Sequence, residues 1–205
     1  MDCNERFALL THVPLLTGLG SRELAQLDAF FDIDEFPPMD APIIRQGDPC
    51  SQLLFLIKGK MKRSFQSPDA SFTVHQVVES PQVIEPESIY SLNGVYRSGY
   101  QFVDKSLVIS IRRGDVTQRM MKLEIFRINY VNLLASKIQQ RLNTSFPPRP
   151  SSIEEKFWHF VHQVFEPPIR GVLDIKMSVL AEYLSETRLN VSTMLRRLES
   201  ARRLN

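Results

Sequence analysis

The sequence predicts an α+β protein in which a small all-β domain is followed by a long helix and then by a helical domain. Short apolar runs separated by turn residues recur about every eight to twelve residues between Phe36 and Ile111, which is typical of a small sandwich or barrel. An apolar stripe at helical spacing then runs through residues 114–143. The proline-rich segment Phe146–Pro150 cannot continue a helix, and helical patterns return in residues 151–205.

The composition narrows the class of protein. A chain of 205 residues, 43% hydrophobic and 23% charged, is long enough to bury the cores of two domains. A net charge of +2 does not argue against DNA binding, because a local basic patch is enough to neutralise phosphates. No run approaches the ~20 apolar residues of a membrane span, and Phe7–Leu10 is too short for the core of a signal peptide. We therefore expect a soluble, cytoplasmic protein with no membrane partner.

Residues 9–32 carry leucines and phenylalanines at spacings of three and four, which predicts a helix with Ser21 as an N-cap. Gly47 and Gly59 fall in the turns of the β domain, where a positive φ is needed. The apolar runs that predict its strands are Ile43–Ile44, Leu53–Ile57, Met61–Phe65, Phe72–Val78 and Val103–Ile111.

Residues 114–143 predict one helix about 45 Å long at ~1.5 Å per residue. Its main apolar stripe consists of Met121, Ile128, Val131, Ala135, Ile138 and Leu142. Beside this stripe lies a second row, formed by Phe126, Tyr130, Leu133 and Leu134. Two apolar rows need two partners, so we expect the β domain to cover one row and the same helix of a second subunit to cover the stripe. The alternative is a helix buried in a monomeric core.

The C-terminal region predicts three helices. Ser152 followed by Glu155 is a capping-box pattern that starts the first helix, and Pro167, Pro168 and Gly171 end it. Two short helices follow, over residues 177–184 and 189–201. We therefore divide the chain into a β domain with its N-terminal helix (1–113), a long helix (114–143), a hinge (144–150) and a helical domain (151–205).

The residue pattern gives no support for metal or enzyme chemistry. Cys3 and Cys50 are two separate thiols, too few for an iron–sulfur cluster or a cysteine zinc site. The four histidines are scattered, and the pair His159 and His162 lacks a further ligand. The sequence contains no Ser-His-Asp arrangement and no glycine-rich phosphate loop. We expect no metal and no catalytic site.

Two longer motifs make this order of parts resemble the cyclic-AMP receptor protein/FNR (Crp/Fnr) family of bacterial transcription regulators along nearly the whole chain. Ile44–Pro49 followed by Leu54–Lys62 is similar to the family's opening β-roll signature, and Val179–Glu199 resembles its helix-turn-helix. The resemblance implies an effector-sensing, cyclic-nucleotide-binding-like β-roll, a dimerisation helix and a C-terminal winged-helix-type helix-turn-helix domain.

A further stretch, Glu85–Ser88 with Tyr96–Gly99, is similar to the cassette that holds a cyclic-nucleotide phosphate in this family. The resemblance implies that an arginine fork binds the phosphate and that a carboxylate accepts from a hydroxyl. The effector-binding residues that it implies are Glu87, Ser88, Arg97 and Ser98. The alternative is that Glu87 and Arg97 form only a structural ion pair.

The sequence departs from the family's effector-binding pattern, which also has an alanine-rich stretch where this chain has Gly99-Tyr100-Gln101. Pro86 stands where the family has a glycine, and a proline has no N–H to offer a phosphate. The Thr-Ser pair that reads adenine is absent from Gln140–Asn143, and Thr144–Ser145 lies beyond it. We therefore expect a small anionic effector other than cyclic AMP.

In the helix-turn-helix, the resemblance implies that Thr187 caps the recognition helix and that Arg188 reads a guanine. Leu189 and Thr193 replace the family's Glu and Arg, so the DNA sequence read must differ. The DNA-binding residues implied are Thr187, Arg188, Leu189, Asn190, Ser192, Thr193, Arg196 and Arg197. The buried face expected is Ala181, Leu184, Val191, Leu195 and Leu198. The alternative is an amphipathic helix with an ordinary solvated face.

Together these features predict a homodimeric transcription regulator that reads an inverted repeat in DNA and is modulated by an effector. The resemblance implies RNA polymerase as a further partner, and a β-wing after the recognition helix. Ser200–Arg203 lacks the glycine turn that leads into a wing, so we expect the wing to be missing or truncated. The alternative function is a sensor or scaffold protein of the same fold that has lost DNA binding or ligand binding.

Overall fold

The computed structural model describes residues 8, 10, 11, 13–145 and 152–201, which belong to two compact units. The first unit comprises residues 1–65 and 77–137, and the second comprises residues 66–76 and 138–205. The second unit therefore includes a piece of the β domain, which the division drawn from the sequence did not predict. Of the expected hinge, residues 144 and 145 belong to a helix and the remainder lies outside the described residues.

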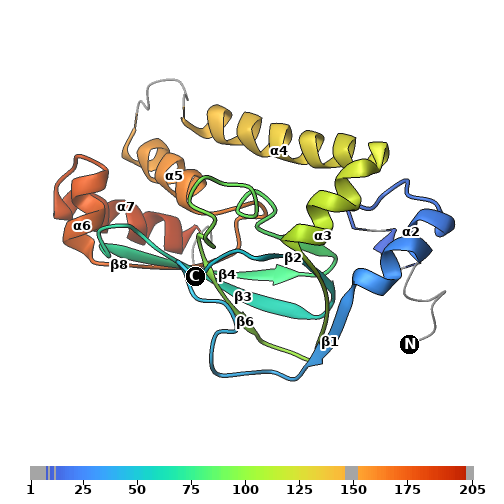
Figure 1. Ribbon diagram of the computed structural model, residues 1–205. Helices are drawn as coiled ribbons and strands as arrows, with labels where there is room; N and C mark the ends of the chain where they lie inside the picture. Colours follow the sequence, from blue (N-terminus) through green and yellow to red (C-terminus); the bar gives the residue numbers. More distant parts are fainter. Residues whose placement is uncertain (1–7, 9, 12, 146–151, 202–205) are drawn as a thin grey trace. The chain divides into compact units, whose positions relative to one another are not determined.

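A four-stranded antiparallel sheet in the order β1-β7-β2-β5 lies in the first unit. β1 and β2 of this sheet are labelled in Figure 1. Its strands are β1 (Asp32–Phe36), β2 (Gln52–Lys58), β5 (Gln82–Ile84) and β7 (Ser106–Arg112). β2 and β7 pair from Gln52 opposite Arg112 to Lys58 opposite Leu107. Consecutive side chains of these two strands are buried, so both of their faces are covered by the core.

The second sheet has the order β6-β3-β4-β8. Its strands are β3 (Lys60–Gln66), β4 (Phe72–Glu79), β6 (Gly99–Phe102) and β8 (Gly171–Ile175). The strands predicted over 53–57, 61–65 and 72–78 are confirmed, whereas the run from Val103 begins its strand only at Ser106, and Ile43–Ile44 forms a single bridge. The sequence missed β1, β5, β6 and β8, because these strands are short and β1 and β8 are largely polar or exposed.

The helix predicted over residues 9–32 is wrong for most of its length. Among the residues described between 9 and 32, helix is limited to Leu10, α2 (Ser21–Leu27) and the 3-10 turn η1 (Asp28–Phe30), with turns from residue 14 to 18. Gly18 has a φ of +86°, which a right-handed helix cannot accommodate. The N-cap of α2 is Gly20 rather than Ser21, and its backbone N–H donates to Glu23 Oε2 at 2.8 Å.

The single long helix predicted over 114–143 is also wrong, because the chain breaks into α3 (Arg113–Gln118), the 3-10 turn η2 (Met120–Lys122) and α4 (Glu124–Ser145). Leu123 is extended between the last two. The break lets Val116 and Met120 both be fully buried before α4 begins. Met121 is consequently half-buried in η2, away from the helix that carries the rest of its predicted stripe.

The second unit combines α5 (Ile153–Val164), α6 (Met177–Tyr183) and α7 (Arg188–Ser200) with β8 and the start of β4. Ser152 caps α5 by accepting from Glu155 N at 3.2 Å, as the sequence predicted. β8 pairs antiparallel with β4 from Phe72 opposite Ile175 to Gln76 opposite Gly171. At this pairing the backbones approach closely, because a Cβ on Gly171 would lie 2.1 Å from the carbonyl oxygen of His75.

Gly59, between β2 and β3, offers a test of the fold. Its φ is +95°, and a Cβ there would lie 2.3 Å from Ser106 Oγ and 2.7 Å from the Lys105 carbonyl oxygen. We predict that Gly59→Ala lowers the free energy of unfolding by about 2–5 kcal/mol, the sum of left-handed strain and overpacking. Gly47→Ala is the matched control, because its φ is +91° but nothing lies within 4 Å of the added carbon. Urea unfolding followed by circular dichroism compares them, and equal losses would contradict the steric explanation.

Candidate effector loop and nucleic-acid interface

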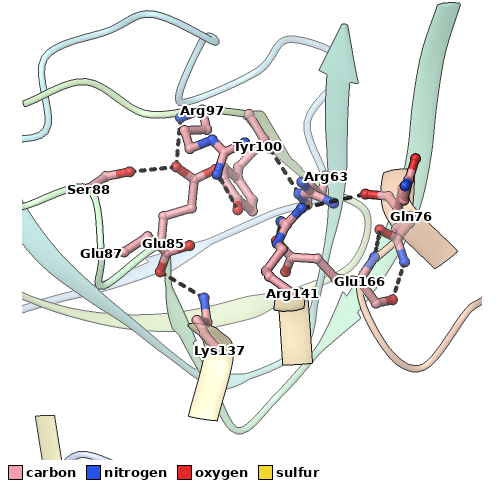
Figure 2. Close-up of polar contacts among 12 residues, drawn as sticks. Arg63, Gln76, Glu85, Glu87, Ser88, Arg97, Tyr100, Lys137, Arg141 and Glu166 are labelled. Carbon is pink, nitrogen blue, oxygen red and sulfur yellow. Dashed lines mark hydrogen bonds and ion pairs between the residues drawn. The ribbon is translucent and has the colours of Figure 1, made fainter. Parts of the chain in front are cut away.

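The loop between β5 and β6 is organised around the buried carboxylate of Glu85, which is 5% exposed (Figure 2). This carboxylate accepts hydrogen bonds from Ser88 Oγ at 2.9 Å, from the backbone N–H of Arg97 at 2.6 Å and from the Tyr100 hydroxyl at 3.1 Å. The donors come from both ends of the loop, so the carboxylate closes the loop on itself. Three hydrogen bonds also satisfy a charge that would be costly to bury alone.

The structure assigns the four predicted effector residues different surroundings. Ser88 donates to Glu85, and Ser98 is fully buried with its hydroxyl accepting from Arg63 Nε at 2.9 Å. Glu87 is ion-paired with Lys137 at 2.7 Å, so it does not form the structural pair with Arg97 that was the alternative. The Arg97 side chain is exposed and has no hydrogen bond or ion pair with any residue that the structure describes.

Two residues of this site were missed by the sequence analysis, namely Glu85 and Arg63. Arg63 is 6% exposed on β3, where it lies opposite Tyr100 of β6. The signal that could have found it is alternation along β3, because Met61 and Arg63 both occupy inward positions. The signal for Glu85 is its place directly after the two buried apolar residues of β5. A carboxylate buried at such a place needs hydrogen-bond donors around it.

Helix α4 holds the outside of the loop through two side chains spaced seven residues apart. Tyr130 is buried and its hydroxyl donates to the Pro86 carbonyl oxygen at 2.5 Å. Burial raises the pKa of Tyr130, so the hydroxyl stays protonated and remains a donor. Lys137 pairs with Glu87, as described above. The predicted second row of the helix, which includes Tyr130, therefore packs against the β unit as expected.

The apolar stripe of α4 is open to solvent within one chain. The exposed fractions of its large side chains are 51% for Ile128, 63% for Val131, 59% for Ile138 and 50% for Leu142, and Ala135 is also exposed. The alternative considered for the helix was a monomeric core that buries this stripe, and the described residues do not form such a core over it. Met121 does not belong to the stripe, because it lies in η2.

In the second unit, α6 and α7 are joined by a tight turn. The backbone N–H of Glu186 donates to the Ala181 carbonyl at 2.9 Å, and Ser185 adopts a φ of +52°. Thr187 is the N-cap of α7, and its hydroxyl accepts from Asn190 N at 3.2 Å, which confirms the predicted cap. The inward side of α7 is formed by Val191, Met194 and Leu198. Leu195, expected there, is only half-buried, and Met194 takes the buried position between Val191 and Leu198.

The outward side of α7 presents most of the residues predicted to bind DNA. Those that are exposed are Thr187, Arg188, Leu189, Asn190, Thr193, Arg196 and Arg197, and Ser192 is half-buried. The three arginines make no ion pair with any described residue. The Asn190 amide donates to Glu186 Oε2 at 3.2 Å.

A carboxylate beside this surface would repel phosphate unless it were neutralised. Lys156 of α5 lies 2.7 Å from Glu186, and the hydrogen bond from this lysine, aided by Asn190, lowers the pKa of Glu186. Glu186 is therefore charged but compensated. The surface that α7 exposes keeps the positive charge of its arginines.

Residues with metal or redox potential form no cluster in the described part of the chain. No group of three or more His, Cys, Asp or Glu side chains there could hold a metal ion. Cys50 is buried, and burial raises the pKa of its thiol, while Cys3 lies outside the described residues. None of the described helices is both long enough and apolar enough to cross a lipid bilayer.

Comparison with known proteins gives structural matches only, since no family model and no curated protein matches the sequence. One match is the sensor domain of the transcriptional regulator DNR from Pseudomonas aeruginosa, with a TM-score of 0.59 and 18% identity. The match covers 73% of this chain and 97% of the DNR domain. The Catabolite Activator Protein of Thermus thermophilus matches 92% of this chain over 87% of its own, with a TM-score of 0.54 and 18% identity.

A third match is CLP, a c-di-GMP-responsive global regulator of Xanthomonas campestris, which covers 89% of this chain and 93% of its own with a TM-score of 0.51 and 13% identity. The chain has the fold of the Crp/Fnr regulators. The resemblance drawn from the motifs is thus confirmed at the level of structure. The Crp/Fnr fold does not by itself identify an effector or a DNA sequence.

Glu85 and Glu87 provide a matched pair for testing the loop. We predict that Glu85→Ala lowers the free energy of unfolding by about 2–4 kcal/mol, because it leaves buried donors from Ser88, Arg97 and Tyr100 without their acceptor. Glu87→Ala removes only a partly exposed ion pair and should cost about 1 kcal/mol or less. Chemical denaturation measures both, and an equal or reversed order would show that Glu85 does not hold the loop.

Proposed function

We propose that the protein is a homodimeric transcription regulator that binds a specific DNA sequence through α7 and responds to a small anionic effector at the loop of Glu85. The observation that carries this proposal is the outward side of α7, where three arginines are exposed without ion-pair partners among the described residues. The activity belongs in the cytoplasm, with RNA polymerase as a further partner.

The order of residues along α7 suits a helix that enters the major groove with its N-terminal end. Arg188 is the first residue of the helix, and the first turn is the part that reaches base edges. A guanidinium there can bind O6 and N7 of guanine together. Arg196 and Arg197 lie two turns further along, where side chains meet phosphates and supply affinity that depends on salt. The solved structures that share this fold include a Catabolite Activator Protein and a global regulator linked to virulence gene expression, which supports a role in transcription.

The exposed stripe of α4 supports a dimer. Four large apolar side chains exposed along one helix face are costly to leave in water, and a second copy of the same stripe would cover them. A dimer with a twofold axis presents two recognition helices about 34 Å apart, one turn of DNA. The target is then an inverted repeat.

For the effector, Arg97 is the residue that supports an anionic ligand. Its guanidinium is exposed and has no bonding partner among the described residues, while its backbone N–H donates to Glu85. Cyclic AMP fits the loop poorly. The carboxylate that would accept from a ribose hydroxyl, Glu87, is already paired with Lys137, and Pro86 offers no N–H. We therefore propose an anion other than cyclic AMP and no iron–sulfur cluster or metal.

We predict that Arg188→Ala and Arg196→Ala weaken DNA binding in different ways. Arg188→Ala should cost about 1–3 kcal/mol on the preferred site and relax the choice of one base pair. Arg196→Ala should weaken all sequences alike and reduce the salt slope by about one. Electrophoretic titration on preferred and random duplexes at several salt concentrations separates them. Equal loss on both duplexes for Arg188→Ala would mean that it contacts only the backbone. Absence of salt-dependent binding would favour a sensor or scaffold.

The dimer is tested by placing charge on the stripe. The double substitution Ile128→Glu with Val131→Glu should give monomers, because two buried carboxylates face their copies across the twofold axis. Val103→Glu is a control with the same change at an exposed apolar residue outside the stripe, and it should leave the mass unchanged. Light scattering measures the molar mass of the double variant and of the control. An unchanged mass for the double variant would exclude this dimer.

Calorimetry with cyclic AMP tests the effector proposal. We expect no binding as strong as 1 µM, which corresponds to about −8 kcal/mol. Native mass spectrometry of the purified wild type should instead reveal a bound anion that is lost in Arg97→Ala. Micromolar or tighter binding of cyclic AMP would refute this part of the proposal.

A further inference from the structure

Leu189 is the most exposed large apolar side chain described in the second unit, at 75%. It lies in the first turn of α7, two residues before the fully buried Val191. Two residues correspond to about 200° around a helix, so Leu189 points away from the core that Val191 enters. The exposure of Leu189 is therefore not explained by a crowded core that forces the side chain outward. It is placed on the outer surface by the same helical phase that buries Val191, Met194 and Leu198.

The surroundings of Leu189 are polar and basic. Arg188 and Asn190 flank it in the chain, and Thr193 follows one turn later on the same side of the helix. No other large apolar side chain of α7 is exposed among the described residues. An isolated leucine between hydrogen-bonding groups suits a ligand surface that is mostly polar but carries one small apolar group.

The major groove of DNA is such a surface. Each base pair presents hydrogen-bond donors and acceptors there, and the 5-methyl group of thymine is the apolar exception. We infer that Leu189 binds the 5-methyl group of a thymine next to the base pair read by Arg188, an inference that rests on the proposed DNA binding. A leucine has no hydrogen-bonding group, so it distinguishes thymine only through the methyl group that it removes from water.

Deoxyuridine isolates this contact, because it keeps every hydrogen-bonding group of thymine and lacks only the methyl. The preferred site is first selected from a random duplex pool with the full-length protein. Each thymine of one half-site is then replaced singly by deoxyuridine, and affinities are measured at one salt concentration. For the wild type we expect one replacement, beside the base pair of Arg188, to weaken binding roughly three- to tenfold.

The Leu189→Ala variant should bind the thymine and deoxyuridine sites equally, and its exposed position should leave folding intact. Met177→Ala, at a partly exposed apolar residue at the start of α6, is the matched control and should keep the discrimination of the wild type. Thr193→Ser removes a methyl group from the same side of α7 and tests whether Thr193 makes the contact instead of Leu189.

Two results would overturn the inference. The first is a wild type that is indifferent to every deoxyuridine, and the second is a Leu189→Ala variant that keeps the penalty. If the penalty persists in Leu189→Ala and is lost in Thr193→Ser, the methyl contact belongs to Thr193. An indifferent wild type would favour a protein partner on this leucine instead. Failure to enrich any sequence would be a different result, because it would reject the DNA-binding proposal itself.

Discussion

The loop between β5 and β6 depends on one constraint, which is that the buried carboxylate of Glu85 must have hydrogen-bond donors. Glu85 satisfies it with donors from Ser88, the Arg97 backbone and Tyr100. The Arg97 backbone N–H points to this buried carboxylate, whereas the Arg97 side chain is exposed to solvent. Arg63 and Ser98 form a second buried contact in the same region. Helix α4 then contacts the loop through the hydrogen bond from Tyr130 to Pro86. The same helix carries the apolar stripe, so a movement of the loop would act directly on that helix.

The second unit depends on a different constraint, the close backbone approach at Gly171. This approach lets β8 pair with β4 and brings the hairpin between β3 and β4 into the unit that contains the helix-turn-helix. Gln76 fastens the pairing by exchanging two hydrogen bonds with the backbone of Glu166, at 2.7 and 3.0 Å. Phe72 lies edge-to-face against Phe160 and Tyr183. Tyr183 is the last residue of α6, so the helix before the recognition turn rests on residues of the hairpin.

One strand thereby takes part in both regions. β3 carries Arg63, which binds Ser98 of the effector loop, and it ends at Gln66, where the hairpin of the second unit begins. β3 therefore links the two units along the chain, from the buried contact of Arg63 with Ser98 to the first residue of the hairpin.

The sequence by itself determined the features that depend on neighbours along the chain. The caps at Ser152 and Thr187, the positive φ of Gly47 and Gly59 and the two helices around Ser185 follow from local hydrogen bonding, steric freedom and periodicity. Tertiary structure alone decided which side chains meet. Glu87 pairs with Lys137, fifty positions away. The carboxylate that accepts the hydrogen bonds within the loop is that of Glu85 and not that of Glu87. The same holds for β8 on β4 and for the break before α4, because their free energy comes from pairing and burial against distant segments, which no local pattern encodes.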